Sequence, residues 1–216
     1  MKNNFVQFSH RVSDPLLDNP VLFNFVRFLL AGKQRGMKKF IQKYLNKYQC
    51  ETIADFCCGT GDFAEVISSH VQYFGWDMNE DFINYAKKRY KNHKNKVFIK
   101  ADVMKSSKIY KKRFDAVLLI STIHHFSDEE LRVLLPQINN IVKKTVIVAD
   151  IIPDPPHRIQ RFITSLDRGR FIRSKKEKVE ILSKYFNVVT TQAIPTRSAV
   201  QLGIVCEIKT SRKTNE

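Results

Sequence analysis

The sequence predicts an α/β protein with a doubly wound, mostly parallel sheet of seven strands and an antiparallel last strand. Three observations lead to this prediction. Short apolar segments alternate with helix-like segments between residues 52 and 149, a pattern typical of βαβ units. Two of these segments, 114–120 and 145–149, are almost continuously apolar, as expected for strands covered on both faces. The last two strand-like segments are separated only by a turn at Pro195, so they must pair antiparallel.

Two helices are expected before the first strand. The segment 20–31 begins with Pro20 and is followed by Gly32, which are typical residues at the start and just beyond the end of a helix. The segment 38–48 places Phe40, Ile41 and Tyr44 at helical spacing. A length of 216 residues suits one compact domain, and we expect a single domain over residues 1–216.

The remaining elements follow from the same patterns. Ser127 is a good N-cap for a helix, and prolines at positions 153, 155 and 156 interrupt the chain after the fifth strand. The predicted strands are 52–56, 72–76, 97–101, 114–120, 145–149, 186–193 and 199–208. The predicted helices of this part are 62–70, 80–90, 128–142, 157–166 and 175–185.

Composition excludes several classes of protein. With 43% hydrophobic residues, 7 Gly and 7 Pro, the chain is neither disordered nor collagen-like. Four cysteines are too few for a disulfide scaffold, and no pair has the spacing of zinc ligands. The N-terminus lacks the apolar core of a signal peptide, and no apolar stretch reaches the roughly 20 residues that cross a bilayer. We therefore expect a cytoplasmic protein that holds no metal.

The charge is large and unevenly distributed. The net charge of +16 fits binding to nucleic acid or to an anionic membrane, and it fits equally a composition rich in lysine. Residues 51–86 contain seven acids and no Lys or Arg, whereas residues 87–113 contain twelve basic residues and one acid. The acidic block disfavours a phosphate ligand and favours a cationic or hydroxyl-rich one.

Three acids of this region follow three successive predicted strands. Asp55 ends the first strand and precedes a tight turn with Gly59 and Gly61, Asp77 ends the second strand, and Asp102 follows the third. The carboxyl ends of parallel strands form the ligand-binding edge of such sheets. A carboxylate at the end of the second strand can accept hydrogen bonds from both hydroxyls of a ribose. A carboxylate at the end of the third strand can accept a hydrogen bond from an exocyclic amine. The spacing therefore predicts a nucleoside site.

The same segments carry a resemblance to a known family. The segments are IADFCCGTGDF (53–63), Trp76-Asp77-Met78, Ala101-Asp102-Val103 and FDAVLLISTIHHFSD (114–128). Together they resemble the class I S-adenosylmethionine-dependent methyltransferases, in particular the methyltransferase domains of types 11 and 25. The resemblance covers roughly residues 38–150 and implies a Rossmann-like methyltransferase fold with S-adenosylmethionine as cofactor.

The resemblance also implies which residues bind the cofactor. All of them lie at the ends of the first four strands or in the turns that follow. The implied positions are Asp55, Cys57, Gly59 and Gly61 for the methionine portion, Asp77 and Met78 for the ribose, Asp102 and Val103 for the adenine, and Ile120 and Ser121 beside the sulfonium. Cys57 stands where the family usually has its first glycine, which puts a standard turn in doubt. The Cys-Cys-Gly-Thr-Gly-Asp sequence is similar to that of quinone C-methyltransferases, but the signature that follows their fourth strand is missing here.

Two further groups of residues are candidates for the acceptor side. His124 and His125 follow the fourth strand, where an imidazole could remove a proton from the acceptor, although one of them could instead bind the loop backbone. Arginines cluster after the fifth strand, including Arg158, Arg170 and Arg173. Because arginine binds planar anions through paired contacts, these residues could hold a carboxylate or phosphate of the acceptor. Salt bridges to nearby acids would explain them equally well.

The sequence favours a small or lipid-like methyl acceptor. In this superfamily an N-terminal helical segment often covers the acceptor pocket, and we expect residues 1–37 to form such a lid segment, with an apolar stretch at 21–30. A helix packed on the sheet edge would explain this stretch equally well. The basic residues that flank it also suit peripheral contact with a membrane. An RNA- or protein-directed methyltransferase is the first alternative. A binding module without turnover is another. The match of residues 59–64 to G-x-G-x-x-A leaves an NAD-dependent oxidoreductase as a further, weaker alternative.

Overall fold

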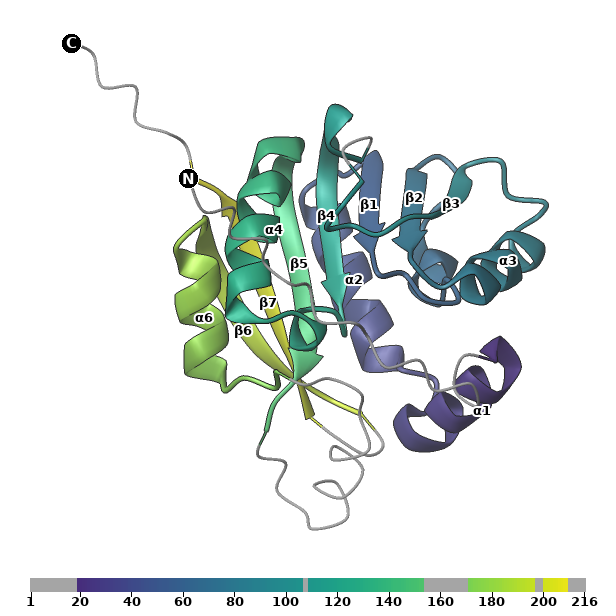
Figure 1. Ribbon diagram of the computed structural model, residues 1–216, viewed down its shortest axis with the longest axis horizontal. Coiled ribbons are helices and arrows are strands. Elements are labelled where there is room, and N and C mark those ends of the chain that lie inside the picture. The colour runs from purple at the N-terminus through teal and green to yellow at the C-terminus, as the bar shows by residue number, and fades with distance from the viewer. Residues whose placement is uncertain (1–18, 107–108, 154–170, 197–199, 210–216) are drawn as a thin grey trace, which may run out of the picture.

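The computed structural model describes residues 19–106, 109–153, 171–196 and 200–209. At its centre is a seven-stranded sheet with the order β3-β2-β1-β4-β5-β7-β6 (Figure 1). Pairing is parallel from β3 to β5, and β7 is antiparallel to both β5 and β6. The predicted fold class is confirmed. The strands are β1 (Thr52–Phe56), β2 (Gln72–Asp77), β3 (Lys96–Lys100), β4 (Phe114–Ile120), β5 (Val142–Ile151), β6 (Phe186–Pro195) and β7 (Val200–Ile208).

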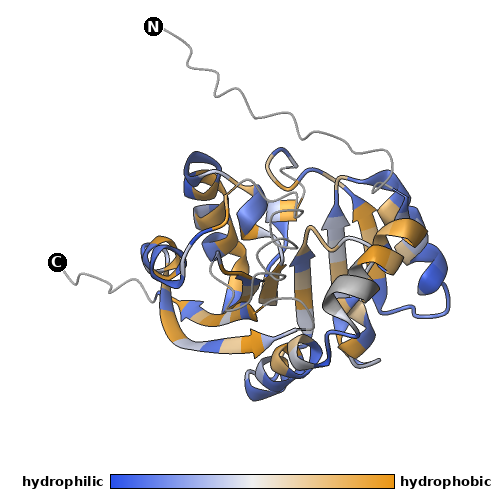
Figure 2. Ribbon diagram, turned by 90° about the horizontal axis from the view of Figure 1, so that it is seen from below, coloured by the Kyte–Doolittle hydropathy of each residue, from blue (hydrophilic) through white to orange (hydrophobic). Residues whose placement is uncertain are grey.

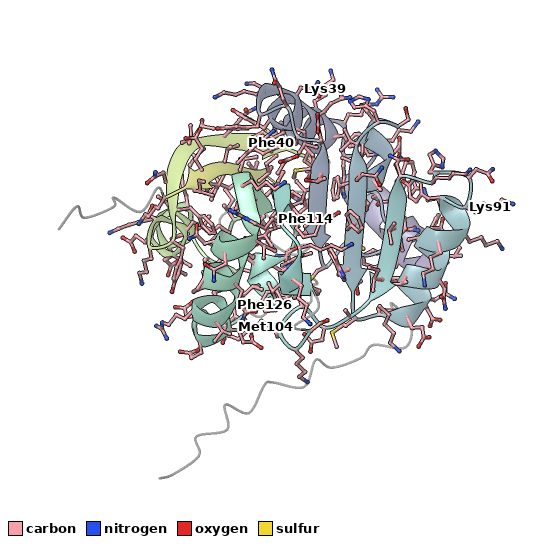
Figure 3. The ribbon with its side chains drawn as sticks, turned by 90° about the horizontal axis from the view of Figure 1, so that it is seen from above. Lys39, Phe40, Lys91, Met104, Phe114 and Phe126 are labelled. Carbon is pink, nitrogen blue, oxygen red and sulfur yellow. The ribbon has the colours of Figure 1, made fainter. Side chains whose placement is uncertain are left out.

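Helices cover both faces of the sheet. One face packs against α2 and α3 around Phe40, Ile83 and Tyr73, and the other packs against α4 and α6 around Leu134, Leu182 and other residues. Phe40 of α2 points toward the sheet while its neighbour Lys39 points outward (Figure 3). The α-helices are α1 (Pro20–Ala31), α2 (Arg35–Lys47), α3 (Glu80–Arg89), α4 (Asp128–Ile141) and α6 (Lys175–Ser183). Short 3-10 helices are η1 (Phe63–Val66), η2 (Ile109–Lys111) and η3 (Ile123–His125).

One predicted helix is wrong. The segment 62–70 forms only the 3-10 helix η1, after which Ile67 takes an extended conformation. Ile67 is buried in the core, and the two serines that follow favour turns over helix. The backbone N–H of Gln72 already donates to the Glu51 carbonyl, so the chain returns to the sheet within five residues of Ile67. The predicted helix 157–166 lies outside the described residues.

Asp115 joins the starts of β1 and β4. Its Oδ2 accepts hydrogen bonds from the backbone N–H groups of Glu51 and Thr52 and from the Thr52 hydroxyl, at 2.9, 3.0 and 3.1 Å. Burial alone would raise the pKa of Asp115, but these hydrogen bonds and the nearby Lys144 outweigh it and hold the pKa below its ordinary value. The ionised carboxylate therefore stabilises the register of the two central strands.

We predict that Asp115→Ala lowers the free energy of unfolding by about 2–4 kcal/mol at pH 7, because buried donors lose a charged acceptor. Since the pKa of Asp115 is lowered on folding, its contribution is present above the ordinary carboxyl pKa near 4 and is lost as the pH falls below it. Denaturant unfolding at several pH values tests this. Glu180→Ala, at an exposed site, is the control and should change stability by less than about 0.5 kcal/mol. An equal loss at acidic and neutral pH would contradict this account.

Candidate functional site

The turn after β1 has the backbone geometry that a close ligand contact requires. Cys57, Gly59 and Gly61 all have positive φ angles of 60°, 55° and 77°, the left-handed region that favours glycine. The turn therefore forms with a cysteine at the position where the family usually has glycine. A Cβ atom on Gly61 would lie 2.9 Å from Phe98 Cε1, whereas a Cβ atom on Gly59 would meet no atom within 4 Å. Gly61 is needed for packing, and Gly59 borders open space.

Asp77 connects this turn to the end of β2. Its Oδ2 accepts from the Gly59 N–H at 2.9 Å, and its Oδ1 accepts from the Asn79 N–H at 2.9 Å. These two bonds fix the orientation of a half-buried carboxylate at the carboxyl edge of the sheet. Met78, the next residue, is 42% exposed. The backbone thus places Asp77 where its carboxylate can accept hydrogen bonds from the hydroxyl groups of a ligand beside the turn.

Asp102 and Val103 follow the end of β3 at the same edge. The N–H of Ala101 donates to the Asp77 carbonyl at 2.9 Å, so the two strand ends are adjacent. Asp102 Oδ1 accepts from the Met104 N–H at 2.9 Å, which holds the carboxylate in a turn. Val103 is 3% exposed. Its side chain belongs to the core of the α4 face, so a surface for packing on a base is not open at Val103 in this structure.

Asp55 lies deeper than the sequence suggested. Its carboxylate is 2% exposed and accepts a hydrogen bond from the Tyr73 hydroxyl at 2.6 Å. Burial raises the pKa of Asp55 to about 7, an effect that the Tyr73 hydrogen bond partly offsets and the charge of Asp77 reinforces. The expectation that Asp55 contacts the methionine portion of the cofactor is therefore corrected, because its carboxylate is buried and bonded to Tyr73.

The end of β4 completes the edge next to β1. Ser121 has a positive φ of 51°, and its N–H donates to the Ala149 carbonyl at 2.7 Å. The Thr122 hydroxyl donates to the Phe56 carbonyl at 3.1 Å. Ile120 is buried, and Ser121 is half-buried. The Thr122 bond brings the turn after β4 against the end of β1, and the Ser121 bond connects the same turn to β5.

The two histidines occupy different environments. His124 is 1% exposed, its Nδ1 contacts the carboxylate of the fully buried Asp150, and its backbone N–H donates to the same carboxylate at 3.0 Å. His125 is half-buried, with its ring centroid 4.1 Å from that of His124. The hypothesis of a catalytic base is corrected for His124, which is enclosed by the protein. His125 retains solvent access and stays a candidate.

Arg173 does not fit the predicted role on the acceptor side. It is 7% exposed, and its guanidinium binds Asp128 at 2.7 Å together with the carbonyl oxygens of Ile123 and Phe126 at 3.0 and 2.7 Å. Arg173 therefore has a structural role, in a salt bridge that differs from those expected from the sequence. Arg158 and Arg170 lie outside the described residues.

Salt bridges neutralise acids beside the turn. Asp62 pairs with Arg89 at 2.6 Å, and Glu65 pairs with Lys38 at 2.8 Å.

A dinucleotide site would need an α-helix N-terminus after the glycine turn to hold its pyrophosphate, but the turn leads only into η1. The geometry therefore does not support the NAD-dependent alternative.

Helix α1 is attached to this edge through two contacts. The Thr60 hydroxyl donates to Asn24 Oδ1 at 2.8 Å, and the rings of Phe23 and Phe82 lie 4.8 Å apart. Asn24 and Phe23 thus hold the helix beside the glycine turn and α3. Figure 1 shows α1 below α3, at the end of the sheet to which β1, β2 and β4 point.

Sequence reasoning missed several residues that shape the site. Tyr73 is one, because its hydroxyl could be recognised as the partner of Asp55 only once the register of β1 and β2 was known. Lys178 is another. It is 1% exposed and donates to the carbonyl oxygens of Ile151 and Arg173, at 2.5 Å each. Its position among the charged residues that begin α6 gave no signal of burial.

Comparison with known proteins supports one family. Residues 53–145 match the family described as methyltransferase domain. No curated protein sequence matches the chain. Similar solved structures include magnesium protoporphyrin IX methyltransferase from Synechocystis PCC 6803 with bound S-adenosylhomocysteine, at 14% identity and a TM-score of 0.70, covering 89% of this chain and 96% of that one.

Two further structures have the same fold. N-methyltransferase NodS from Bradyrhizobium japonicum WM9, in complex with S-adenosylhomocysteine, is 13% identical with a TM-score of 0.66 and covers 83% of this chain and 88% of its own. Human N-acetylserotonin methyltransferase in complex with S-adenosylmethionine is 17% identical with a TM-score of 0.66, covering 88% of this chain and 55% of its own.

The residues present fit S-adenosylmethionine as cofactor. Gly59 faces open space next to the fixed carboxylate of Asp77, and the buried Asp55 adds negative charge beneath a ligand that is itself cationic. The strand order, the turn geometry and the matching domain agree. Residues 53–145 form a methyltransferase domain, and the chain has the fold of S-adenosylmethionine-dependent methyltransferases of class I.

Proposed function

We propose that this methyltransferase acts on a small or lipid-like acceptor that enters beside α1. The observation that carries this proposal is the attachment of an apolar helix to the glycine turn, through Asn24 on Thr60 and Phe23 on Phe82. An apolar wall next to the cofactor turn suits an apolar acceptor, because apolar surface is removed from water when the two meet. The small-molecule names of two similar structures, those of the protoporphyrin and N-acetylserotonin enzymes, agree with it.

The protein's own contribution is to position the reactants and exclude water. S-adenosylmethionine supplies a methyl group that is already activated on a sulfonium. Asp77 would hold the ribose, Asp102 the adenine amine and Gly59 the methionine portion, while Asp55 provides charge below. Ile120 and Ser121 would border the reacting end. Correct orientation of two reactants supplies much of the rate enhancement in such transfers. If the acceptor must lose a proton, the half-buried His125 in η3 would be the candidate base.

An RNA- or protein-directed activity is the alternative, and the excess of basic residues favours it. An extract assay with a methyl-labelled cofactor separates the two. Under the proposal, label appears in a small-molecule or organic-solvent fraction and is absent with the Asp77→Ala variant. Label that is found in RNA or protein instead would contradict the proposal.

The two glycines of the turn should respond differently to alanine. Gly59→Ala should reduce the affinity for S-adenosylhomocysteine by tenfold or more while lowering stability only by the roughly 1–2 kcal/mol of a left-handed alanine, since its Cβ enters the ligand space. Gly61→Ala should destabilise the fold further, because its Cβ meets Phe98. Calorimetric binding and denaturant unfolding of both variants test this. Unchanged affinity in Gly59→Ala would count against this placement of the cofactor.

Affinity for the cofactor should depend on the ionisation of Asp55. Because its pKa is raised to about 7, the carboxylate that favours a cationic ligand is present mainly above pH 7, and binding should weaken as the pH falls below it. Tyr73→Phe removes a hydrogen bond to the charged form, so the midpoint should move to higher pH and affinity at pH 7 should fall by roughly three- to tenfold. Titration calorimetry from pH 6 to about 9 measures both effects.

Asp55→Asn is the matched control, and its cofactor affinity should be nearly independent of pH across this range.

The same raised pKa has a consequence for stability, because the folded state binds the proton more tightly than the unfolded state, whose carboxyl titrates near 4. The free energy of unfolding should therefore fall as the pH rises from about 4 to about 7, and this fall should be reduced in Asp55→Asn. If Tyr73→Phe leaves the midpoint of the pH profile of cofactor binding unchanged, the proposed link between Asp55 ionisation and cofactor affinity is refuted.

A further inference from the structure

The outward side of α1 carries an apolar stripe. Val21, Phe25 and Phe28 are 67%, 57% and 48% exposed, and their spacing of four and three residues places them on one face of the helix. Phe23, which packs against Phe82, lies about 200° around the helix from Phe25. The helix is therefore held by its inner side; Val21 and Phe25 face away from the domain, and Phe28 lines a groove that Asp62 and Glu65 also line. Figure 2 shows α1 as a predominantly apolar helix on the outside of the molecule.

Positive charge borders one end of this stripe. Lys33 and Arg35, in the connection to α2 and at its start, are exposed, as is Lys39 one turn later. A groove of about 510 Å³ opens beside Phe28 and has Lys33 and Arg35 in its lining. α1 itself contains no acidic residue.

The acids near this end are neutralised within the protein. Asp62 and Glu65 line the same groove, and they pair with Arg89 and Lys38. Helix α3 packs against α1 through Phe82; it carries the exposed acids Glu80, which pairs with Lys100, and Asp81 in its first turn, and the exposed Lys87 and Lys88 in its last turn. The exposed surface at this end of α1 is thus apolar along its centre and cationic beside it.

We infer that the apolar stripe and its basic border dock the protein on the surface of an anionic lipid bilayer. A helix with exposed phenylalanines and flanking cations lies in the membrane interface, with its rings in the acyl boundary and its cations at anionic headgroups. Single-stranded RNA would instead favour basic groups interleaved with the aromatic ones, whereas Arg27, the one basic residue of α1, is about 100° around the helix from Phe28 and so is not a stripe position. No helix of the described residues is long and apolar enough to span a bilayer, so the contact is peripheral.

The position of the stripe suggests how docking serves the reaction. The inner side of the same helix contacts Thr60 next to the cofactor turn, so a bilayer bound to the outer side of α1 would lie one helix away from the edge at which an acceptor would enter. A lipid-like acceptor could then leave the bilayer without crossing water. This consequence rests on the proposed function, whereas docking itself can be measured in the absence of turnover.

Sedimentation of the full chain with unilamellar vesicles tests the inference. Phosphatidylcholine vesicles are compared with vesicles that also contain phosphatidylglycerol. We expect binding to the anionic vesicles that weakens with added salt. Phe25→Ser with Phe28→Ser should reduce it by roughly tenfold or more, from the loss of buried apolar area. The matched control is Val133→Ser with Val189→Ser, at positions 46% and 44% exposed on α4 and β6, and it should bind like the wild type.

A second variant set tests the charge without touching the stripe. Lys33→Gln, Arg35→Gln and Lys39→Gln together should reduce anionic-vesicle binding by roughly tenfold or more, since each cation near such a surface contributes about fivefold. Lys175→Gln, Lys176→Gln and Lys184→Gln, exposed on and just after α6, form the control with the same change in net charge. All of these positions are on the surface, so thermal unfolding should stay close to that of the wild type.

Three results would overturn the inference. They are equal binding to neutral and anionic vesicles, equal losses in the stripe variant and its control, and binding of a homopolymeric RNA without binding of vesicles. Stabilisation by S-adenosylhomocysteine, measured in the same preparations, keeps this inference separate from the proposed function. A chain that binds vesicles but is not stabilised by this ligand would support docking and contradict the function.

Discussion

The hydrogen bond from the Gly59 N–H to the Asp77 carboxylate organises the candidate site. It connects the turn after β1 to the end of β2 across two neighbouring strands, in a turn in which Gly59 adopts the left-handed conformation that glycine allows. The same bond fixes a charged acceptor beside the space that Gly59 leaves open. One local constraint thus sets the position of the turn, the orientation of the carboxylate and the location of the cofactor.

Most of the fold could be predicted because its strands are buried. The segments Thr52–Phe56 and Phe114–Ile120 have the same bounds in the sequence prediction and in the structure, since apolar runs between polar turns mark strands that helices cover on both faces. The segment 62–70 failed for a tertiary reason. Burial of Ile67 and the short return to β2 ended the helix after η1, and local propensity carries no information about either.

The site divides in the same way. Asp55, Asp77 and Asp102 could be located because acids at strand ends stand out in sequence. Their roles could not all be assigned, because the burial of Asp55 depends on Tyr73 from the neighbouring strand. The loop after β4 is a second case, in which Asp150 and Arg173 hold His124 and Phe126 from distant segments. Hydrogen bonds and salt bridges between residues of different elements can be recognised only when it is known which elements lie side by side.

The central claim is that Asp77, held by the glycine turn, accepts hydrogen bonds from the ribose hydroxyls of S-adenosylmethionine. A crystal structure of the chain with S-adenosylhomocysteine tests it most directly. We expect both ribose hydroxyls within hydrogen-bonding distance of the Asp77 carboxylate, with the bond from the Gly59 N–H still present. A ligand bound elsewhere, or an Asp77 side chain turned away from the sugar, would contradict the account.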